Sequence, residues 1–294
     1  MDSRSILEKA VDKARELGCQ VRFGSEFEFY LFKTDENGDP TQEPFDRAGY
    51  MDVAPEDKGE NVRREICLNL QDMGIQPESS HHEEGPGQNE IDFRYSDALT
   101  AADNAMHFKT VVKTAALRNG LYADFSPKPI EGAAGNGMHI NMSVKCDDGR
   151  DRSDAFMAGV LAHVREITAL LNPTEGSYRR LGEHKAPRYI TWSPENRSQL
   201  IRIPAAKGEY QRIELRSPDP MANPYLAYAL LIHAGLDGIR RNLRSPQPVN
   251  ENLYTAPESL TSQLEQLPAS LEEARQLARS SAFVASVLPK QMLD

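Results

Sequence analysis

Two glutamates lie two residues apart inside an otherwise apolar segment, RFGSEFEFYLF, at residues 22–32. Side chains of a β-strand alternate between its two faces, so Glu26 and Glu28 would share one face and Phe27 and Phe29 the other. For one strand alone, a solvent-exposed outer face is the simplest explanation. A metal site also explains the pattern, because neighbouring carboxylates repel each other and a divalent cation removes that repulsion.

Four further segments repeat this alternation, and lysine is absent from their centres. They are residues 87–95, 137–144, 198–204 and 210–217, and their polar residues include Glu90, His139, Arg202, Arg212 and Glu214. Glutamate and histidine bind divalent metals, and arginine binds phosphate. The repetition favours a shared site over a set of exposed faces.

If these strands form one antiparallel sheet, their acids and their histidine converge. The set is Glu26, Glu28, Glu90, His139 and Glu214, and Glu83 of the loop HHEEGPG could join it. These ligands suffice for two hard cations such as Mg²⁺ or Mn²⁺, with water completing the shells. The arginines expected around them are Arg180, Arg197, Arg202, Arg212 and Arg216. Metals and arginines together favour phosphoryl transfer from a nucleotide. No Walker glycine loop or kinase signature is present, so the nucleotide would bind on another scaffold.

Helices are predicted where apolar residues recur every three or four positions. The predicted ranges are 3–17, 57–73, 97–119 and 153–171, followed by a helix that starts at Asn223 and Pro224 and a last helix with Ser270 and Glu273 as capping box. Asn37 and Gly38 predict a hairpin turn. No repeat, low-complexity tract or linker is evident, so we expect a single domain over residues 1–294.

Composition narrows the class of protein. The 294-residue chain has a formal net charge of -10, which disfavours nucleic acid or an anionic membrane as partner. Cys19, Cys67 and Cys146 are scattered and odd in number, so no disulfide framework or zinc site is expected and a reducing compartment fits best. No signal-like or membrane-length apolar run is present. We therefore expect a cytoplasmic protein.

Six segments in a fixed order carry a resemblance to a known family. They are GSEFEFYLF, HHEEGPGQNEIDFRY, GNGMHINMSV, NPTEGSYRRL, NRSQLIRIP and RIELRSPDPMANPYLAYALLIHAGLDGI. Over nearly its whole length the sequence resembles the catalytic domain of the glutamine synthetase family. The resemblance implies an α+β fold of the glutamine synthetase/guanido kinase type, a curved antiparallel sheet flanked by helices. It also implies that ATP phosphorylates the γ-carboxyl of glutamate, and that ammonia or an amine then displaces phosphate.

The resemblance also assigns roles by position. Glu28, Glu83 and Glu90 would hold the metal on the substrate side, and Glu26, His139 and Glu214 the metal that meets the nucleotide phosphates. Glutamate would be bound by Arg180, Arg216 and Gly135. Phosphate would be bound by Arg197 and Arg202. The expected catalytic residues are Arg180, Arg197 and Arg202. Ser143, Asn141, Arg202 and Arg212 would lie beside ATP, with Asn141 where many members have a histidine.

Several departures from the family pattern bear on the nucleophile. The segment GEHKAPRY is one residue shorter than the family's flap, and Lys185 takes the position of its glutamate. A lysine would repel ammonium, which shifts weight towards a γ-glutamyl-amine ligase or another nucleophile, unless Glu183 or His184 takes over. Ala133 and Ala134 replace polar residues before the substrate glycine.

The chain begins where the family's catalytic domain begins, without the β-grasp domain that completes a neighbouring active site. We therefore expect a homo-oligomer, with a separate β-grasp partner as one way to complete the site. Tyr254 resembles a tyrosine that some bacterial members adenylylate, although an exposed loop residue explains it more simply. Structural roles are expected for His81, His82, His107, His163, His184 and His233. Two alternatives stay open: a non-catalytic member that binds metal and nucleotide as a sensor or assembly subunit, and a phosphotransferase acting on another small carboxylate or guanidino compound.

Overall fold

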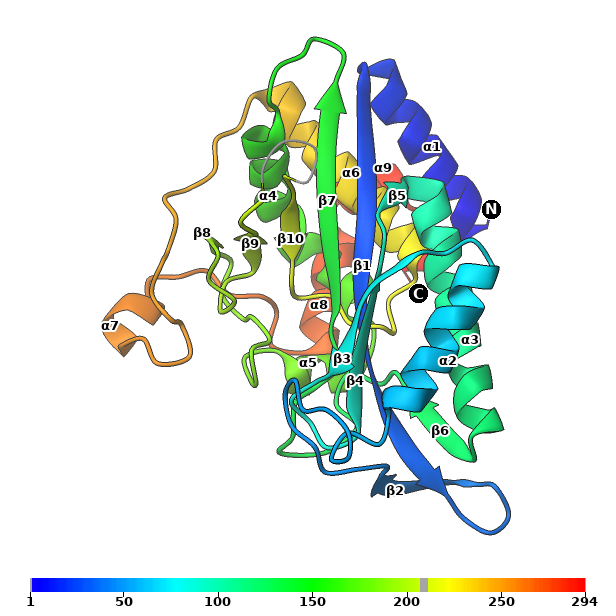
Figure 1. The fold of residues 1–294 in the computed structure, drawn as a ribbon. Helices are drawn as coiled ribbons and strands as arrows, with labels where there is room; N and C mark the ends of the chain where they lie inside the picture. The colour runs from blue at the N-terminus through cyan, green and yellow to red at the C-terminus, as the bar shows by residue number, and fades with distance from the viewer. Residues whose placement is uncertain (1, 207–210, 294) are drawn as a thin grey trace.

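The computed structural model describes residues 2–206 and 211–293. Its centre is a curved sheet with helices packed behind it (Figure 1). The strands are β1 Cys19–Thr34, β2 Pro40–Pro44, β3 Pro77–His82, β4 Gln88–Phe93, β5 Ser96–Asp97, β6 Leu121–Asp124, β7 Met138–Cys146, β8 Trp192–Pro194, β9 Ile201–Ile203 and β10 Ile213–Leu215. The helices are α1 Ser3–Glu16, α2 Glu60–Asp72, α3 Ala98–Arg118, α4 Ser153–Leu171, α5 Glu175–Arg180, α6 Pro224–Arg241, α7 Glu258–Thr261, α8 Leu271–Ser280 and α9 Ala282–Val287, with a 3₁₀ turn at Lys290–Met292.

Strand β1 is the centre of the sheet, whose main order is β3-β4-β1-β7-β10-β9-β8. It pairs antiparallel with β4 on one side and β7 on the other, so Glu26 lies opposite both Asp92 and His139. Glu28 lies opposite Glu90. The expected antiparallel pairing is confirmed for these strands, whereas β8 and β9 at the edge run parallel. The α+β sheet flanked by helices is therefore confirmed, with one parallel pair.

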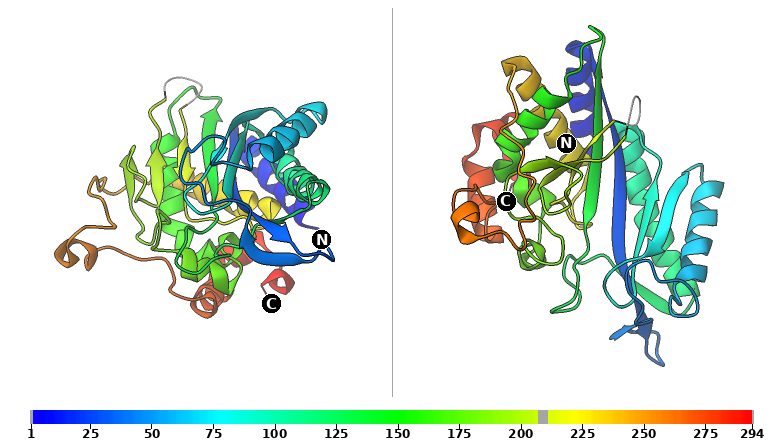
Figure 2. Two further views of the ribbon diagram at one scale, coloured as in Figure 1. Left: turned by 60° about the horizontal axis from the view of Figure 1, so that its bottom comes forward. Right: turned by 60° about the vertical axis from the view of Figure 1, so that its left-hand side comes forward.

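The two faces of β1 differ as the alternation predicts. Phe27 and Phe29 are fully buried on the helix side, where the Phe27 ring lies 5.0 Å from the Phe108 ring of α3. Behind β1 and β7, α4 and α6 pack very closely: a Cβ atom at Gly159 would stand 2.1 Å from the Ala234 carbonyl oxygen. Figure 2 shows this helix layer from the side. The opposite face of β1 is therefore left to polar side chains.

The predicted helices agree with the structure to within a few residues. Asn223 caps α6, its side chain accepting from the N–H groups of Tyr225 and Leu226. Helix α2 begins at Glu60, three residues later than predicted. The Asp57 side chain accepts the Gly59 N–H, so residues 57–59 form a loop before the helix. Among the described helices, none combines the length and the apolarity needed to cross a membrane.

The capping box expected at the last long helix is half formed. Ser270 accepts the backbone N–H of Glu273, as predicted. The Glu273 carboxylate, however, accepts the N–H of Ala269 rather than that of Ser270. The hairpin predicted at Asn37 and Gly38 is present between β1 and β2.

The expectation of unpaired cysteines is wrong. Cys19 and Cys146 form a disulfide, and Cys67 is free. The two half-cystines are 127 residues apart in sequence, and no spacing rule pairs residues so distant. The register of β1 and β7 places them directly opposite each other at the end of the ladder. The expectation of a reducing compartment rested on the absence of disulfides, and the Cys19–Cys146 bond removes that basis.

Candidate active site

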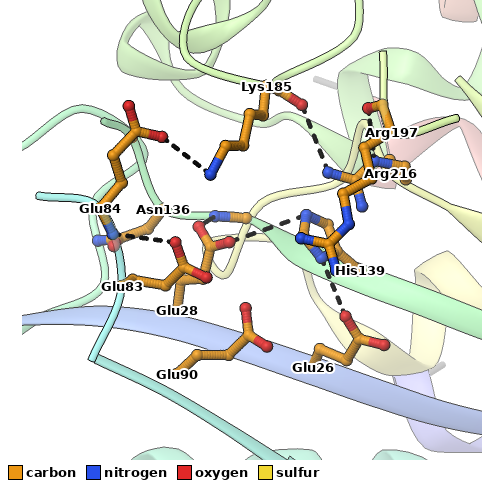
Figure 3. Close-up of polar contacts among 12 residues, drawn as sticks. Glu26, Glu28, Glu83, Glu84, Glu90, Asn136, His139, Lys185, Arg197 and Arg216 are labelled. Atoms are coloured by element: carbon orange, nitrogen blue, oxygen red, sulfur yellow. Dashed lines mark hydrogen bonds and ion pairs between the residues drawn. The ribbon is translucent and has the colours of Figure 1, made fainter. Parts of the chain in front are cut away.

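The polar faces of the central strands open into a pocket of about 240 Å³ on the concave side of the sheet. Its walls combine strands β1, β3, β4, β7 and β9 with loops around Tyr50, Glu84 and Lys185. Acidic side chains line its floor, and basic side chains lie at its rim (Figure 3). The strand alternation thus brings most of the predicted acids and arginines into one cavity; Glu214 lies behind its wall and Arg212 lines a neighbouring cavity.

A first group of metal-type ligands comes from three different strands. Glu26, His139 and Glu214 offer ligand atoms that lie within 4.8 Å of one another. The His139 Nδ1 atom is 3.1 Å from Glu26 Oε2 and 3.8 Å from Glu214 Oε1. Burial alone would raise the pKa of Glu26, but His139 and Asn141 outweigh it and lower that pKa to about 2. Glu26 is therefore an anion throughout the ordinary pH range.

A second group lies beside it around Glu90. Glu90 comes together with Glu28 and His139, and also with His81 and Glu83. The predicted trio of Glu28, Glu83 and Glu90 thus shares Glu90 between two ligand groups. The His81 ring lies 3.2 Å from Glu83.

Two further residues of the pocket are not among the predicted ligands. The sequence predicts a purely structural role for His81, yet its ring lies in the pocket among the acids. Asp92 is the second: its Oδ1 atom is buried without a hydrogen-bond partner. Position offered a signal for Asp92, because it follows Glu90 by two residues and so shares its face.

This donor set fits divalent cations. Burial, and then repulsion from Asp92 and Glu28, raises the pKa of Glu90 well above its usual value. Burial and the charge of Glu26 do the same for the pKa of Asp92, and burial raises the pKa of Glu28. Buried acids that resist ionisation next to one another are the groups whose charge a cation would balance.

Two arginines hold Glu214 from the far side. Arg202 lies 2.6 Å from Glu214 Oε2, and Arg216 lies 2.6 Å from Oε1. Glu214 is fully buried, so both contacts operate away from solvent. The pair links the first ligand group to the basic rim of the pocket, and Arg197 extends that rim by donating to the Tyr50 hydroxyl at 3.2 Å.

Arg180 is buried at the end of the pocket near the segment 133–137. It donates to the carbonyl oxygens of Ser217 at 2.8 Å and Arg216 at 3.3 Å. Gly135 lies against it: a Cβ atom there would stand 2.3 Å from the Pro127 carbonyl oxygen and 2.8 Å from Arg180 Cγ. A glycine is therefore needed for the chain to pass between Arg180 and Pro127.

Next to the acids a smaller cavity of about 110 Å³ contains three of the four residues expected near ATP, while the fourth, Arg202, lines the main pocket. Asn141, Ser143 and Arg212 line it, and Glu26 and Asp92 form the wall it shares with the main pocket. Asn141 donates to Glu26 at 2.8 Å and accepts from Arg212 at 2.9 Å. Asn141 thus connects the arginine to the first ligand group.

The flap segment faces the pocket with Lys185 and not with an acid. Lys185 Nζ lies 3.2 Å from Glu84 Oε2 (Figure 3). It also lies 4.4 Å from the centre of the Tyr50 ring. Glu183 points elsewhere and pairs with Lys128 at 2.8 Å. His184 lies 3.4 Å from Glu84. The carboxylate opposite the flap is therefore Glu84, which the sequence pattern did not single out.

His184 of the flap also lines the pocket, against the structural role expected for it, whereas His82, His107, His163 and His233 do not line it. His82 is fully buried and bonds to Asp46 at 2.9 Å and to the Glu83 carbonyl oxygen at 2.7 Å. His163 lies 3.0 Å from Asp237 on the helix layer. Neither His107 nor His233 lines a described pocket, and Tyr254 is 40% exposed. Because His82 touches the backbone of Glu83, it can influence a predicted ligand indirectly.

Asp46 and His82 are predicted to orient Glu83. Asp46 also accepts the N–H of Gly87, so it holds both ends of the turn that carries Glu83. Asp46→Asn should weaken Mn²⁺ binding roughly 10- to 100-fold, the usual effect of losing a partner behind a ligand. Titration calorimetry measures this affinity.

A matched control for Asp46 is Asp57→Asn. Asp57 is equally buried and lies in one group with Asp46 and His82, but its hydrogen bonds go to Arg63 and Gly59 and not to His82. It should lower stability without a comparable change in Mn²⁺ affinity. Equal losses of affinity in the two variants would show that Asp46 acts through stability alone.

Comparison with known proteins identifies the family. The sequence profile of the glutamine synthetase catalytic domain matches residues 1–294. Glutamine synthetase of Clostridium saccharobutylicum is 49% identical, over 93% of this chain and 65% of its own length. Glutamine synthetase of Methanosarcina mazei is 45% identical, over 100% of this chain and 69% of its own length. The chain thus spans about two thirds of the length of these relatives.

Solved structures agree with the sequence matches. GmaS in complex with ADP superposes with a TM-score of 0.87 at 33% identity, covering 98% of this chain and 70% of its own. Glutamine synthetase of Plasmodium falciparum superposes with a TM-score of 0.83 at 25% identity, covering 99% of this chain and 74% of its own. Profile, relatives and structures agree with one another, and the chain belongs to the glutamine synthetase family, with which it shares the catalytic domain.

Proposed function

We propose that this chain is the catalytic domain of an ATP-dependent ligase that joins glutamate to ammonia or an amine through a γ-glutamyl phosphate. The observation that carries this proposal is the pair of carboxylate–histidine groups that meet at His139 under a rim of arginines. Two cations and several guanidinium groups around one cavity suit transfer of a phosphoryl group to a carboxylate. The relatives named glutamine synthetase, and GmaS, a γ-glutamylmethylamide synthetase, support it.

Six side chains would hold two Mg²⁺ or Mn²⁺ ions: Glu28, Glu83 and Glu90 on the glutamate side, and Glu26, His139 and Glu214 on the nucleotide side. His81 and Asp92 stand close enough to assist. Bound there, the cations would neutralise phosphate charge and polarise its oxygens. His139 lies between the groups, and Glu26 fixes its ring by the 3.1 Å contact at Nδ1.

The arginines would bind and orient the anionic substrates. Arg180 and Arg216 would hold the carboxylates of glutamate, since both are buried and line the pocket, and Arg180 lies against Gly135. Arg197 and Arg202 would hold the transferred phosphate. A guanidinium group donates two parallel hydrogen bonds to a carboxylate or phosphate and stays charged, so the geometry is set before reaction.

The nucleotide would lie beside Ser143, Asn141, Arg202 and Arg212, in the smaller cavity and along its border with the main pocket. Arg212 is held through Asn141 to Glu26, so a phosphate bound by Arg212 would lie next to the first ligand group.

Assembly is part of the proposal. We propose that residues 1–294 act as one domain, that the chain works in the cytoplasm as a homo-oligomer, and that a β-grasp domain, in the same or another polypeptide, completes the site.

Phosphate release tests the proposed function. The purified chain is assayed with ATP and Mg²⁺, with and without glutamate, and with hydroxylamine, ammonia or methylamine as nucleophile. We expect phosphate release that requires glutamate, and we expect γ-glutamyl hydroxamate or amide to form with it. ATP binding without turnover would favour the non-catalytic sensor or assembly subunit. Turnover with another acceptor and no amide would favour the phosphotransferase.

Arg180→Lys is predicted to raise the KM for glutamate roughly 10- to 100-fold, because a lysine cannot bind a carboxylate with two parallel bonds. The KM for ATP should change little. Arg179→Lys, on the exposed side of the same helix, is the matched control. An unchanged KM for glutamate in Arg180→Lys would remove Arg180 from the glutamate site.

A further inference from the structure

The flap segment 182–185 is a tight turn that aims Lys185 into the reaction pocket. His184 and Lys185 have φ angles of 42° and 67°, in the left-handed region that non-glycine residues seldom adopt. The turn is held by the hydrogen bond from the Gly182 N–H to the Ala186 carbonyl oxygen at 3.0 Å. Arg216 also donates to the Lys185 carbonyl oxygen at 3.4 Å. Lys185 is thus placed by the backbone.

The Lys185 ammonium group occupies a site that suits a substrate ammonium ion. It lies between the Glu84 carboxylate and the face of the Tyr50 ring, and both attract cations. A tethered lysine acts at a high effective concentration. Ammonium or a small alkylammonium ion would therefore compete poorly for this position.

Behind the turn lies a separate cavity of about 490 Å³. Its lining residues are Gly182, His184, Lys185, Arg188, Tyr189, Ser198, Leu253 and Tyr254. His184, Lys185 and Arg188 are basic, and none of the described lining residues is acidic. His184 and Lys185 also line the reaction pocket, so the turn is the wall between the two spaces. We call this space the basic cavity.

We propose that the amine nucleophile carries an anionic group, a carboxylate, sulfonate or phosphate, which binds in the basic cavity on Lys185 and Arg188 while the amino group reaches the reaction pocket. This inference rests on the proposed function and names its substrate class. When Lys185 turns to the anion, Glu84 loses its ion pair with Lys185, keeps only the 3.4 Å contact with His184, and can accept a proton from the substrate ammonium. The amine nitrogen then bonds to the γ-carbonyl carbon, the bond between that carbon and the phosphate oxygen breaks with its electron pair going to the oxygen, and phosphate leaves with the second amine proton.

Matched amines test this inference in the ATP- and glutamate-dependent assay of phosphate release. The pairs are methylamine and glycine, ethylamine and taurine, and ethanolamine and phosphoethanolamine. The anionic member of at least one pair is expected to have a kcat/KM roughly 10- to 100-fold higher, the usual value of a charge-assisted hydrogen bond. Equal or better activity with every uncharged-tail amine would overturn the inference.

Charge-reversal variants test whether the preference for anionic amines arises in the basic cavity. Lys185→Glu and Arg188→Glu are each expected to raise the KM of the preferred anionic amine at least about tenfold. Hydroxylamine, a small neutral nucleophile, should be used by Arg188→Glu, whose side chain lies outside the reaction pocket, with an unchanged KM for glutamate. Arg244→Glu, an exposed residue away from both cavities, is the control. A raised KM for glutamate in Arg188→Glu would instead make the basic cavity the passage for glutamate, against the inference.

Hydroxylamine also separates the inference from the proposed function beneath it. If hydroxamate forms but no anionic amine is preferred, the ligase stands and the inference fails. If ATP and glutamate give no hydroxamate under any condition, with or without a supplied β-grasp domain, the proposed function itself fails.

Discussion

Glu214→Gln should reduce ATP- and glutamate-dependent amide formation by roughly 10³-fold, the loss expected when one ligand of a catalytic cation loses its charge. Glu214 is fully buried and contacts both Arg202 and Arg216 at 2.6 Å. Without its charge the two guanidinium groups repel each other and lose their partner. Breaking such a buried pair costs about 3–5 kcal/mol in the free energy of unfolding.

Two measurements separate catalysis from stability at Glu214. Urea unfolding gives the loss of stability, and amide formation at low temperature gives the activity of the chain that stays folded. Glu43→Gln is the matched control, since Glu43 pairs with Lys33 on the exposed hairpin. Activity that falls merely in step with the unfolded fraction would contradict a role for Glu214 in the reaction.

Mn²⁺ is expected to stabilise the chain more strongly as the pH rises from 5 to 8. The folded chain raises the pKa of Glu90 above the ordinary 4.5 by burial and then by neighbouring acids, and it raises the pKa of Glu28 by burial, which outweighs the opposing charge of His139. An acid with a raised pKa contributes stability below its unfolded pKa and loses it as the pH rises through the folded pKa. Without metal, these groups therefore weaken the fold towards pH 8. A bound cation would balance the charge of these carboxylates in place of the protons that they lose as the pH rises.

The size of the metal effect follows from mass action. At a concentration 100 times the dissociation constant, each site adds about 2.7 kcal/mol, so two sites add about 5 kcal/mol. The midpoint of thermal unfolding should rise by roughly 10 °C at pH 8. The measurement is calorimetry with and without Mn²⁺ at matched ionic strength, and the difference between the two curves isolates the metal.

Glu90→Gln gives this prediction a sharp control. It removes one buried charge, so the metal-free variant should be more stable than the parent chain at pH 8. It should also lose much of the gain from Mn²⁺. A variant that is less stable without metal, yet gains as much from Mn²⁺, would show that Glu90 is neither strained nor a ligand.

The alternation of side chains along the strands was enough to predict much of the site, because its period is two residues. Once a strand is placed, the face of every side chain follows, and Glu26, Glu28, Glu90 and His139 can be grouped from their positions in the sequence alone. The resemblance to the family then divides them between two cations. The folded chain brings the same side chains together, while their roles remain proposals.

What the sequence did not reveal depends on register and on loops. The strand period places Asp92 on the same face as Glu90, but its position opposite Glu26 follows from the register of β4 and β1, which no local pattern determines. Lys185 and Glu84 meet across two separate loops, and their contact depends on the left-handed turn at 184–185. The bond between Cys19 and Cys146 likewise follows from the register of β1 and β7.

The acidic face of β1 has a consequence for the newly made chain. Without its acids, the segment from Phe23 to Phe32 would be an aromatic strand of the kind that aggregates. Glu26 meets His139 across 113 residues, so for much of synthesis the strand has no native neighbour on that side. During that time two adjacent charges oppose pairing with other chains, as inward-pointing charges do in natural sheets. The side chains proposed to bind metal in the folded protein would thus also oppose aggregation of the unfinished chain.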